Sequence, residues 1–396
     1  MRPELAALVR EEMTGLPVEA HDAESGHPLV VPGYGADEVL GALDALLSTR
    51  VTMGAQVRAF EAAWAARCGR RHGVMVNSGS SANLLVFAAL VEIGRLAVGD
   101  EVLVPAVTWS TSLFPVLQVG LRPKLVDVSE RTLGLDRTGV DAARGPRTRA
   151  ALAVHLLGQP CETDLDLLVV EDACGAHGAS VGGRPVGSLG HAATFSFFFS
   201  HHITTIEGGI VVTDDDALAD AMRSLRAHGW IRERSDRDVL AARSPEVDPR
   251  FLFVSAGWNL RPTEIAGAFG LVQDRRLDAW VERRRRNHAD WCAALAGKVE
   301  VFPELPGTAH AGFAFPMLHP ERARICAALE AAGVETRPIS GSNLARQPVW
   351  PALGLGDPGP LPVADRVHTD GFFVGNSHAF GPAHGERLAR LIGAIT

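Results

Sequence analysis

The chain has 396 residues, of which 46% are hydrophobic and 21% are charged, and its formal net charge is −8. This composition is typical of a globular protein with a large core, and the mild acidic excess gives no reason to expect nucleic acid or an anionic membrane as partner. The five cysteines are far apart and form no CxxC pair, so neither a disulfide framework nor a zinc or iron–sulfur site is expected.

The N-terminal segment MRPELAALVREEM is charged throughout and has no apolar signal core. No apolar run along the chain approaches membrane-spanning length. We therefore expect a cytoplasmic protein without a membrane partner.

Further along, residues 36–48 and 54–67 carry apolar residues at helical spacing, which predicts two helices.

From residue 73 to residue 229, short apolar segments alternate with helical patterns. Strands are predicted at 73–77, 101–105, 124–128, 149–155, 167–172, 193–199 and 209–214, with helices after the first strand, at 109–118 and at 217–229. This alternation predicts an α/β protein with a mainly parallel sheet covered by helices on both faces. The connection GQPCETDLDL is unusually short, because a parallel crossover normally contains a helix.

The C-terminal part of the chain has a different pattern. Residues 230–256 are polar and predict a long loop, and residues 262–297 predict one long helix. A helix at 321–333 and a strand at 334–339 follow, and ERLARLIGAI predicts a final helix. We expect a large domain over residues 1–285, including the N-terminal helices, and a smaller α+β domain over residues 286–396.

Polar residues follow several predicted strands at the edge where open α/β sheets bind ligands. In VNSGSSANL (76–84), the small residues open a helix, so they form either a phosphate site or a plain serine N-cap. Asp172 is a cap, a metal ligand or the partner of a protonated ring nitrogen. Ser196 is a core hydroxyl or a second phosphate donor, and Trp109 is a core residue or a plate for a planar ligand.

Taken together, these residues suit one ligand type. At one edge of the sheet they offer a phosphate site, an aromatic ring for stacking, a carboxylate for a ring nitrogen and a second hydroxyl. That ligand is pyridoxal 5′-phosphate (PLP), a cofactor that supplies an electron sink while the protein supplies binding and charge placement. The residues alone therefore favour a PLP-binding protein with no metal in its site.

Four motifs carry a resemblance to a known family: VNSGSSANL, EDACGAHGA, SFFFSHHITTIEGGIVVTDD and GWNLRPTEIAGAFG, in this order. From about residue 28 to its end, the chain resembles the sugar aminotransferases of fold-type I PLP enzymes, the DegT/StrS family. The resemblance implies that Gly79 and Ser80 donate backbone N–H groups to the cofactor phosphate and that Ser196 donates its hydroxyl. It also implies that Trp109 stacks on the ring and that Asp172 pairs with the ring nitrogen.

The resemblance extends to a partner subunit and to the substrate. Asn259 matches a position that reaches the phosphate from the neighbouring subunit, which implies a homodimer with shared sites. Arg337, Arg346 and His378 resemble substrate-side positions, although an arginine in a loop is more often a solvated surface charge.

His201 stands where the family normally has the lysine that binds PLP covalently. The two lysines of the chain, Lys124 and Lys298, lie in other segments. One branch of the family carries histidine here, and it consists of nucleotide-sugar 3-dehydratases. The resemblance therefore implies a PLP-dependent carbon–oxygen lyase that removes the C3 hydroxyl of a 4-keto-6-deoxy nucleotide sugar. The cofactor would act as pyridoxamine phosphate (PMP), and L-glutamate would regenerate it.

An imidazole titrates near neutrality, so His201 suits the role of acid and base in such an elimination. His202 is a weaker candidate for the same role, and either histidine could simply cap the turn. Two alternative functions stay open: a PLP or PMP enzyme acting on a secondary metabolite that is not a nucleotide, and a non-catalytic relative that binds cofactor or sugar. Gly175 and Ile206 depart from the family pattern, which usually has glutamine and glycine at these positions.

Overall fold

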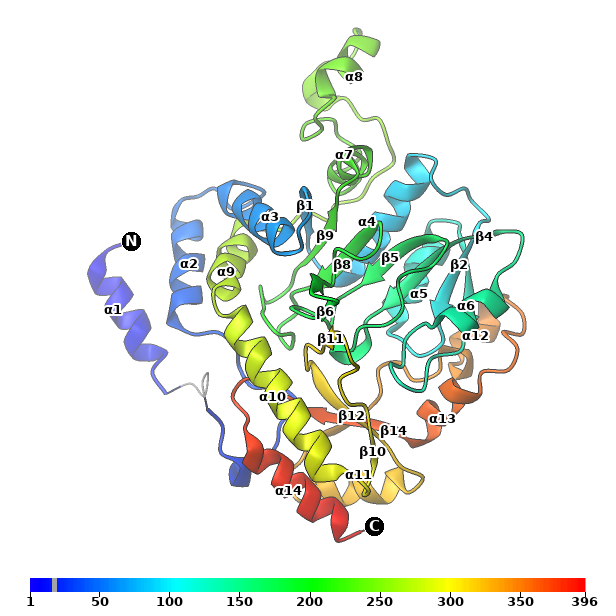
Figure 1. Ribbon diagram of the computed structural model, residues 1–396. Coiled ribbons are helices and arrows are strands. Elements are labelled where there is room, and N and C mark those ends of the chain that lie inside the picture. The colour runs from blue at the N-terminus through cyan, green and yellow to red at the C-terminus, as the bar shows by residue number, and fades with distance from the viewer. Residues whose placement is uncertain (16–19, 396) are drawn as a thin grey trace.

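The structure is a computed structural model that describes residues 1–15 and 20–395 (Figure 1). Its centre is a seven-stranded sheet with the order β1-β9-β8-β5-β4-β2-β3, in which only β9 runs against its neighbours. The strands are β1 (His72–Val76), β2 (Glu101–Pro105), β3 (Arg122–Val126), β4 (Thr148–Val154), β5 (Leu168–Asp172), β8 (Ala192–Ser196) and β9 (Gly209–Thr213). The mainly parallel sheet predicted from the sequence is confirmed.

Helices cover both faces of this sheet. They are α3 (Ala55–Arg67), α4 (Gly79–Glu92), α5 (Ser110–Gln118), α6 (Arg137–Ala143), α7 (Asp216–Leu225), α9 (Glu264–Asp274) and the start of α10 (Leu277–Leu295). The helix α2 (Ala36–Leu47) packs on α9. Local signals begin several of them: the Asp215 side chain caps α7, and the Thr263 side chain caps α9. The pattern predicted at 217–229 ends earlier than expected, at Leu225.

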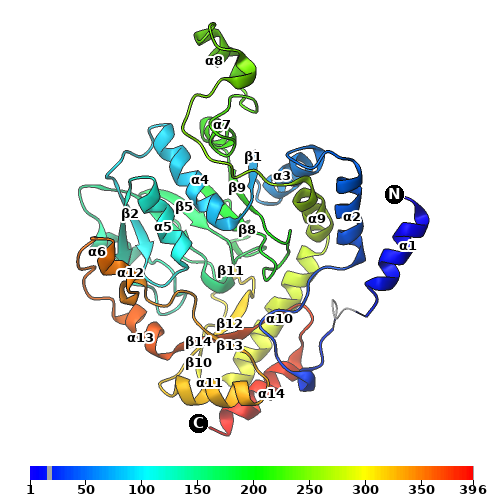
Figure 2. The ribbon, with the colours of Figure 1, turned by 180° about the vertical axis from the view of Figure 1, so that it is seen from behind.

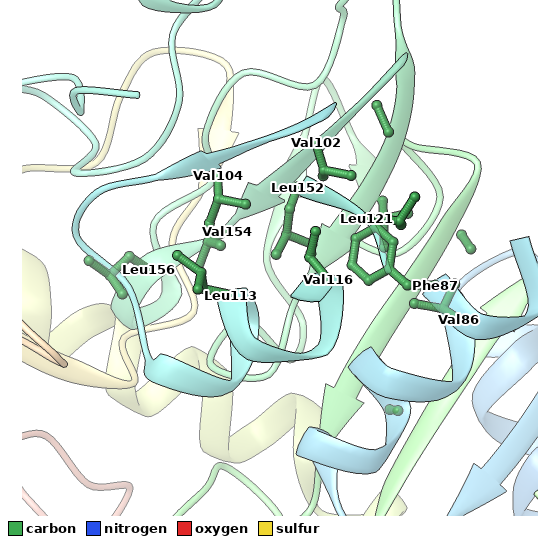
Figure 3. Packing of buried hydrophobic residues seen from close by; sticks show 14 of the residues in the cluster. Val86, Phe87, Val102, Val104, Leu113, Val116, Leu121, Leu152, Val154 and Leu156 are labelled. Carbon is green, nitrogen blue, oxygen red and sulfur yellow. The ribbon is translucent and has the colours of Figure 1, made fainter. Parts of the chain in front are cut away.

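The largest hydrophobic cluster fills the space between the sheet and the helices α4, α5 and α7. Figure 3 shows part of this cluster, in which α4 and α5 face β2 and β4 with the side chains of Val86, Phe87, Leu113, Val116, Val102, Val104, Leu152 and Val154. A second cluster packs α3, α9 and the start of α10 on the other face, around Phe60, Trp64 and Phe197. Both faces of the sheet are therefore buried, as a parallel sheet requires.

The short connection between β4 and β5 contains no α-helix. It forms one 3-10 turn, η2 (Leu156–Gly158), and then runs extended along the sheet. Leu165 and Leu167 pack against the outer face, where Leu165 contacts the cluster of Ala153 and Val169. The connection itself thus covers the sheet where the sequence indicated that a helix is missing.

A four-stranded antiparallel sheet, ordered β10-β12-β14-β13, forms the C-terminal part. Its strands are β10 (Glu300–Val301), β12 (Ala314–Leu318), β13 (Thr336–Pro338) and β14 (Gly371–Gly375), and its helices are α11 (Arg322–Ala331), α12 (Val349–Ala352), α13 (Pro362–Asp370) and α14 (Pro382–Gly393). The remaining elements are α1 (Pro3–Glu12), β6 (Ser180–Val181), β7 (Arg184–Pro185), β11 (Thr308–Ala309) and the short turns η1 (Ala23–Ser25) and η4 (Leu344–Arg346). The predicted domain limit after residue 285 lies within α10, and the division into two domains stays a prediction.

Two sequence-based expectations are wrong. The helix predicted over 262–297 is two helices, because the chain turns at Arg275 and Arg276 so that α9 packs on α2 and α3 while α10 packs on α14. The loop predicted over 230–256 contains α8 (Arg237–Arg243) and the turn η3 (Pro249–Phe251). In Figures 1 and 2, α8 projects from the body beyond α7. Within the described residues, no helix is long and apolar enough to cross a membrane.

Candidate active site

The carboxyl ends of five parallel strands, β1, β2, β4, β5 and β8, meet at one edge of the large sheet around a cavity of about 680 Å³. The predicted site residues that line this cavity are Gly79, Ser80, Trp109, Asp172, Ser196, His201 and Arg337. All of these residues except Arg337 end or follow strands of the same direction in the large sheet, which brings them together at one edge. Arg337 reaches the cavity from β13 of the C-terminal sheet.

The start of α4 forms the anion-binding end of the cavity. The Ser78 hydroxyl caps the helix by accepting the N–H of Ser81 at 3.1 Å. The N–H groups of Gly79 and Ser80 lie in the first turn and need no helical partner, so they are available to an anion. A Cβ atom on Gly79 would lie 2.5 Å from Cβ of Ser196, so this close approach of strand and helix requires glycine.

Asp172 ends β5 and points into the cavity as a fixed carboxylate. Its Oδ2 accepts hydrogen bonds from Nδ2 of Asn83 at 3.0 Å and from Oγ of Ser112 at 2.7 Å, while its Oδ1 accepts the N–H of Cys174 at 3.2 Å. Asn83 is itself held by a hydrogen bond from Oγ1 of Thr194. Hydrogen bonds donated to the charged form stabilise a buried carboxylate, so Asp172 can hold a protonated ring nitrogen at this point.

Glu171 points to the opposite face of the sheet, as expected for a neighbouring strand residue. Its carboxylate accepts the backbone N–H groups of Gly187, Leu189 and Gly190 and contacts Nε2 of His155 at 3.1 Å. Glu171 therefore holds the chain before β8 in place, and Asp172 alone of the two acidic residues reaches the cavity.

The two adjacent histidines have different surroundings. His201 is half-buried and lines the cavity. Burial, and then the positive charge of Arg284, lower the pKa of His201 to about 3, so its imidazole is neutral at physiological pH. This lowered pKa differs from the near-neutral pKa that the sequence analysis assumed for His201. A neutral imidazole is the form that accepts a proton.

His202 is only 1% exposed, and both of its nitrogens have partners. Its Nε2 lies 3.0 Å from the carbonyl oxygen of Ala311, which requires a donor, and its Nδ1 lies 3.2 Å from Nδ1 of His177. Burial lowers the pKa of His202 well below its usual value. His202 thus belongs to the packing beneath the cavity.

Trp109 and Arg337 lie at the open side of the cavity. Trp109 stands immediately before α5 and is 61% exposed, although it lines the cavity wall. Arg337 lies on β13 of the C-terminal sheet, is exposed, and donates from Nη1 to the carbonyl oxygen of Thr336. The indole of Trp109 offers an apolar surface and the guanidinium of Arg337 offers a cation, and a bound ligand could contact both.

Three predicted site residues do not line this cavity. Asn259 is exposed and accepts a hydrogen bond from Nε of Arg261 at 2.8 Å. Arg346 forms an ion pair with Asp365, and the ring of His378 stacks on Trp280 with ring centroids 3.9 Å apart. The structure places Arg346 and His378 in other surroundings within this subunit.

The sequence did not single out several residues of the site. Asn83 and Ser112 hold Asp172, and Phe313 packs against His201 from the C-terminal part. Asn83 carries a usable signal, because it is the one polar residue in the apolar stretch 82–91 of this helix. Phe313 carries none, since only the packing of the two sheets brings it to His201.

Comparison with known families agrees with this geometry. Residues 34–392 match the model of the DegT/DnrJ/EryC1/StrS aminotransferase family. The chain belongs to this family. Its architecture, a mostly parallel sheet covered by helices with a smaller C-terminal sheet, is that of the fold-type I PLP-dependent enzymes.

Individual members of the family are similar to this chain over most of their length. The chain is 36% identical over 360 residues to GDP-4-keto-6-deoxy-D-mannose 3-dehydratase of Yersinia pseudotuberculosis, and the match covers 86% of this chain and 91% of the relative. A solved structure of GDP-4-keto-6-deoxymannose-3-dehydratase, with a histidine replaced by asparagine and with bound GDP-perosamine, has a TM-score of 0.86 at 32% identity. That match covers 92% of this chain and all of the other.

A second solved structure of the same enzyme contains a trapped PLP-glutamate geminal diamine. It has a TM-score of 0.84 at 31% identity and again covers 92% of this chain and 100% of the other.

Proposed function

We propose that this protein removes the C3 hydroxyl group from a 4-keto-6-deoxy nucleotide sugar, with PMP as cofactor and L-glutamate as amino donor. The observation that carries the proposal is the position of His201, which brings an imidazole in place of a lysine amine into a cavity with the other features of a PLP site. The 36% identity to a 3-dehydratase that acts on a 4-keto-6-deoxy sugar nucleotide supports the substrate class.

The residues of the cavity suit this cofactor. The first turn of α4 offers free N–H groups to a phosphate, and the missing Cβ atom of Gly79 allows this turn to approach Ser196 closely. Asp172 offers a buried carboxylate whose other hydrogen bonds come from neutral donors, so its negative charge is available to a pyridinium N–H. The exposed face of Trp109 offers a stacking surface.

When bound, pyridoxamine phosphate supplies an amine for the C4 ketone and a conjugated ring that accepts electrons. Asp172 keeps the ring nitrogen protonated by its negative charge. His201, which is half-buried and neutral, would take a proton and then donate it to the departing C3 hydroxyl. Arg337 at the cavity mouth provides a cation for the nucleotide phosphates.

We also propose that the protein works as a homodimer with shared active sites. The segment 230–256 leaves large apolar side chains in solvent, among them Phe251 at 60% and Phe253 at 51% exposure. Asn259, which lies on this same connection, is exposed and outside its own cavity, as expected of a residue that serves the neighbouring site. The cytoplasmic location expected from the sequence stays a prediction.

The first experiment combines a cofactor test with a substrate test. The absorbance spectrum of the protein with PLP is recorded before and after addition of L-glutamate, and conversion to a PMP-like band without a borohydride-trapped lysine adduct is expected. GDP-4-keto-6-deoxymannose is then supplied, and loss of the C3 oxygen is followed by mass spectrometry.

Substitution of His201 tests the proposed base. His201→Asn should lower the dehydration rate at least ~100-fold, the usual contribution of a general acid or base. His319→Asn, which changes a histidine on the C-terminal part, serves as the matched control and should retain the wild-type rate. Unchanged turnover in His201→Asn, or a wild-type protein that deoxygenates no 4-keto-6-deoxy nucleotide sugar, would overturn the proposal.

A further inference from the structure

One contact at the site joins the two sheets of the molecule. Phe313 directly precedes β12 of the C-terminal sheet, whereas His201 follows β8 of the large sheet. Their ring centroids lie 5.0 Å apart with an interplanar angle of 65°, which is an edge-to-face arrangement. Both rings line the cavity. The orientation of the His201 imidazole thus depends on a side chain from the other part of the molecule.

The backbone around Phe313 is held firmly from the large-sheet side. In the 311–313 segment, the N–H of Ala311 donates to the carbonyl oxygen of Gly158, and the N–H of Phe313 donates to that of Leu157. The carbonyl oxygen of Ala311 accepts Nε2–H of His202. His202 therefore supports its neighbour His201 indirectly, through the segment that carries Phe313.

The C-terminal side holds the same segment with two polar side chains. Nδ2 of Asn376 donates to the carbonyl oxygen of Gly312 at 2.9 Å, and Nη1 of Arg284 donates to that of Phe313 at 3.2 Å. A Cβ atom on Gly312 would lie 2.9 Å from the carbonyl oxygen of Arg284, so the packing is close on this side as well.

Arg284 is an unusual residue to find at this place. It lies on α10, is 6% exposed, and among the described residues has backbone carbonyl partners but no carboxylate. A buried cation without a counter-ion is costly to the fold, so a role beyond stability is a reasonable inference. Burial lowers the pKa of Arg284 to about 10, which still leaves it charged at physiological pH.

The positive charge of Arg284 acts on three histidines at and beneath the cavity. It contributes to the lowered pKa of His177, His201 and His202, in each case in addition to burial. The other ionisable groups around His201 are the two neighbouring histidines and the cavity-lining groups, namely His155, Asp172, Cys174, Glu207 and Arg337.

We infer that Arg284 and Phe313 are positioning residues for His201: Arg284 fixes the backbone of Phe313, and the Phe313 ring fixes the plane of the His201 imidazole. The inference rests on the proposed function for the role of His201 itself. A base must be held within a fraction of an ångström of its productive position, and a side chain from a second rigid sheet achieves this better than the turn that carries His201 alone.

The first test replaces the ring. Phe313→Leu keeps an apolar side chain but removes the flat edge against His201, so kcat should fall at least tenfold. The KM for the sugar nucleotide and the PLP dissociation constant, measured by absorbance titration, should change less than threefold, because the polar groups proposed to hold these ligands are left in place. Equal loss of cofactor binding, or an unchanged kcat, would overturn the inference.

The second test reads His201 directly and needs neither cofactor nor turnover. NMR of protein labelled with ¹³C at the histidine ring follows the His201 signal, which is assigned by its absence in His201→Asn. Arg284→Met should raise the pKa of His201, seen as a larger chemical-shift change between pH 7.5 and 5.5 than in the wild type. Arg284→Lys keeps the charge and should leave that pKa near the wild-type value.

Arg286→Met is the matched control, because it removes an exposed cation from the same helix. It should leave the His201 signal unchanged. A folded Arg284→Met variant with a wild-type His201 titration would overturn the inference, because it would show that Arg284 does not influence the surroundings of His201. If Arg284→Met does not fold, Arg284→Lys provides the test. The lysine should bind the carbonyl oxygen of Phe313 less well, so kcat should fall, whereas the pKa of His201 should stay near the wild-type value. The NMR result does not depend on the dehydration reaction. A failure of the proposed function can therefore be distinguished from a failure of this inference.

Discussion

At the scale of the single residue, Ile206 stands out beside the cavity. Its φ is 71°, in the left-handed region that β-branched residues avoid, and its side chain is 49% exposed. It directly precedes Glu207, which lines the cavity. Glycine, which the family resemblance leads us to expect here, adopts this backbone conformation without strain. The strain is retained next to the site, where such conformations often occur.

Ile206→Gly should therefore stabilise the protein. Relief of the left-handed strain outweighs the extra chain entropy of glycine in the unfolded state, and we expect a net gain of about 1 kcal/mol. Urea unfolding monitored by circular dichroism measures this change. Ile206→Val keeps the β-branch and should show no gain, and an equal gain in both variants would argue against backbone strain as the cause.

At the scale of the element, Glu264 connects two helices. It lies at the start of α9, and its buried carboxylate accepts the N–H groups of Gly54, Gln56 and Val57 around the first turn of α3. These N–H groups have no partner within α3. A Cβ atom on Gly54 would lie 2.7 Å from the carboxylate, so the glycine is needed for this close approach. One side chain from a distant segment thus caps the helix.

Removal of this carboxylate should cost a large part of the stability. Glu264→Ala leaves buried donors without an acceptor, and we expect the free energy of unfolding to fall by about 3 kcal/mol. Thermal and urea unfolding provide the measurement. Glu282→Ala, at an exposed site on α10, is the control and should change the stability by less than about 0.5 kcal/mol. Similar losses in both variants would contradict the capping role.

At the scale of the whole molecule, buried histidines make stability depend on pH. Burial lowers the pKa of His27 to about 4, and it lowers the pKa of His177, His202 and His310 well below the ordinary value. In the unfolded chain these groups titrate near 6.5 and bind protons that the folded protein excludes. Their contribution to stability is therefore complete above pH 6.5 and is lost as the pH falls toward 4.

The free energy of unfolding should consequently fall between pH 7.5 and pH 5. His27 alone accounts for about 2 kcal/mol of this fall, as its change of pKa implies. His27→Gln can still donate a hydrogen bond to the carbonyl oxygen of Gly375 and does not titrate, so its stability should depend less on pH. Urea unfolding at several pH values tests this, and identical slopes in the two proteins would contradict it.

The exposed arm around α8 leads to a prediction about assembly. The double variant Phe251→Asp with Phe253→Asp places charges on the surface proposed to contact a second copy, so the dimer should dissociate to monomers. Light scattering after size-exclusion chromatography measures the mass. Leu8→Asp, in exposed α1, is the control and should remain dimeric. A wild-type protein that is monomeric at micromolar concentration would reject the shared site.

Much of the fold follows from local patterns. Apolar segments and strand-end motifs predicted the central strands and the gathering of Gly79, Trp109, Asp172 and Ser196 at one edge, whereas the place of His201 was predicted from the family resemblance. This succeeded because each signal lies within a few residues and because parallel strands bring their carboxyl ends together. The break at Arg275 and Arg276 was not predicted, since no glycine or proline marks it and only the packing partners of α9 and α10 differ.

The sequence by itself determined the family, the sheet and the replacement of the usual lysine by His201, because these depend on residue type and order. Only the tertiary structure decided that His201 faces the cavity while His202 lies beneath it, and that Arg346 and His378 have other partners. It also brought Arg284 and Phe313 to His201. The contact between His201 and Phe313 joins two segments that are far apart in the sequence, and its geometry depends on how the two sheets pack.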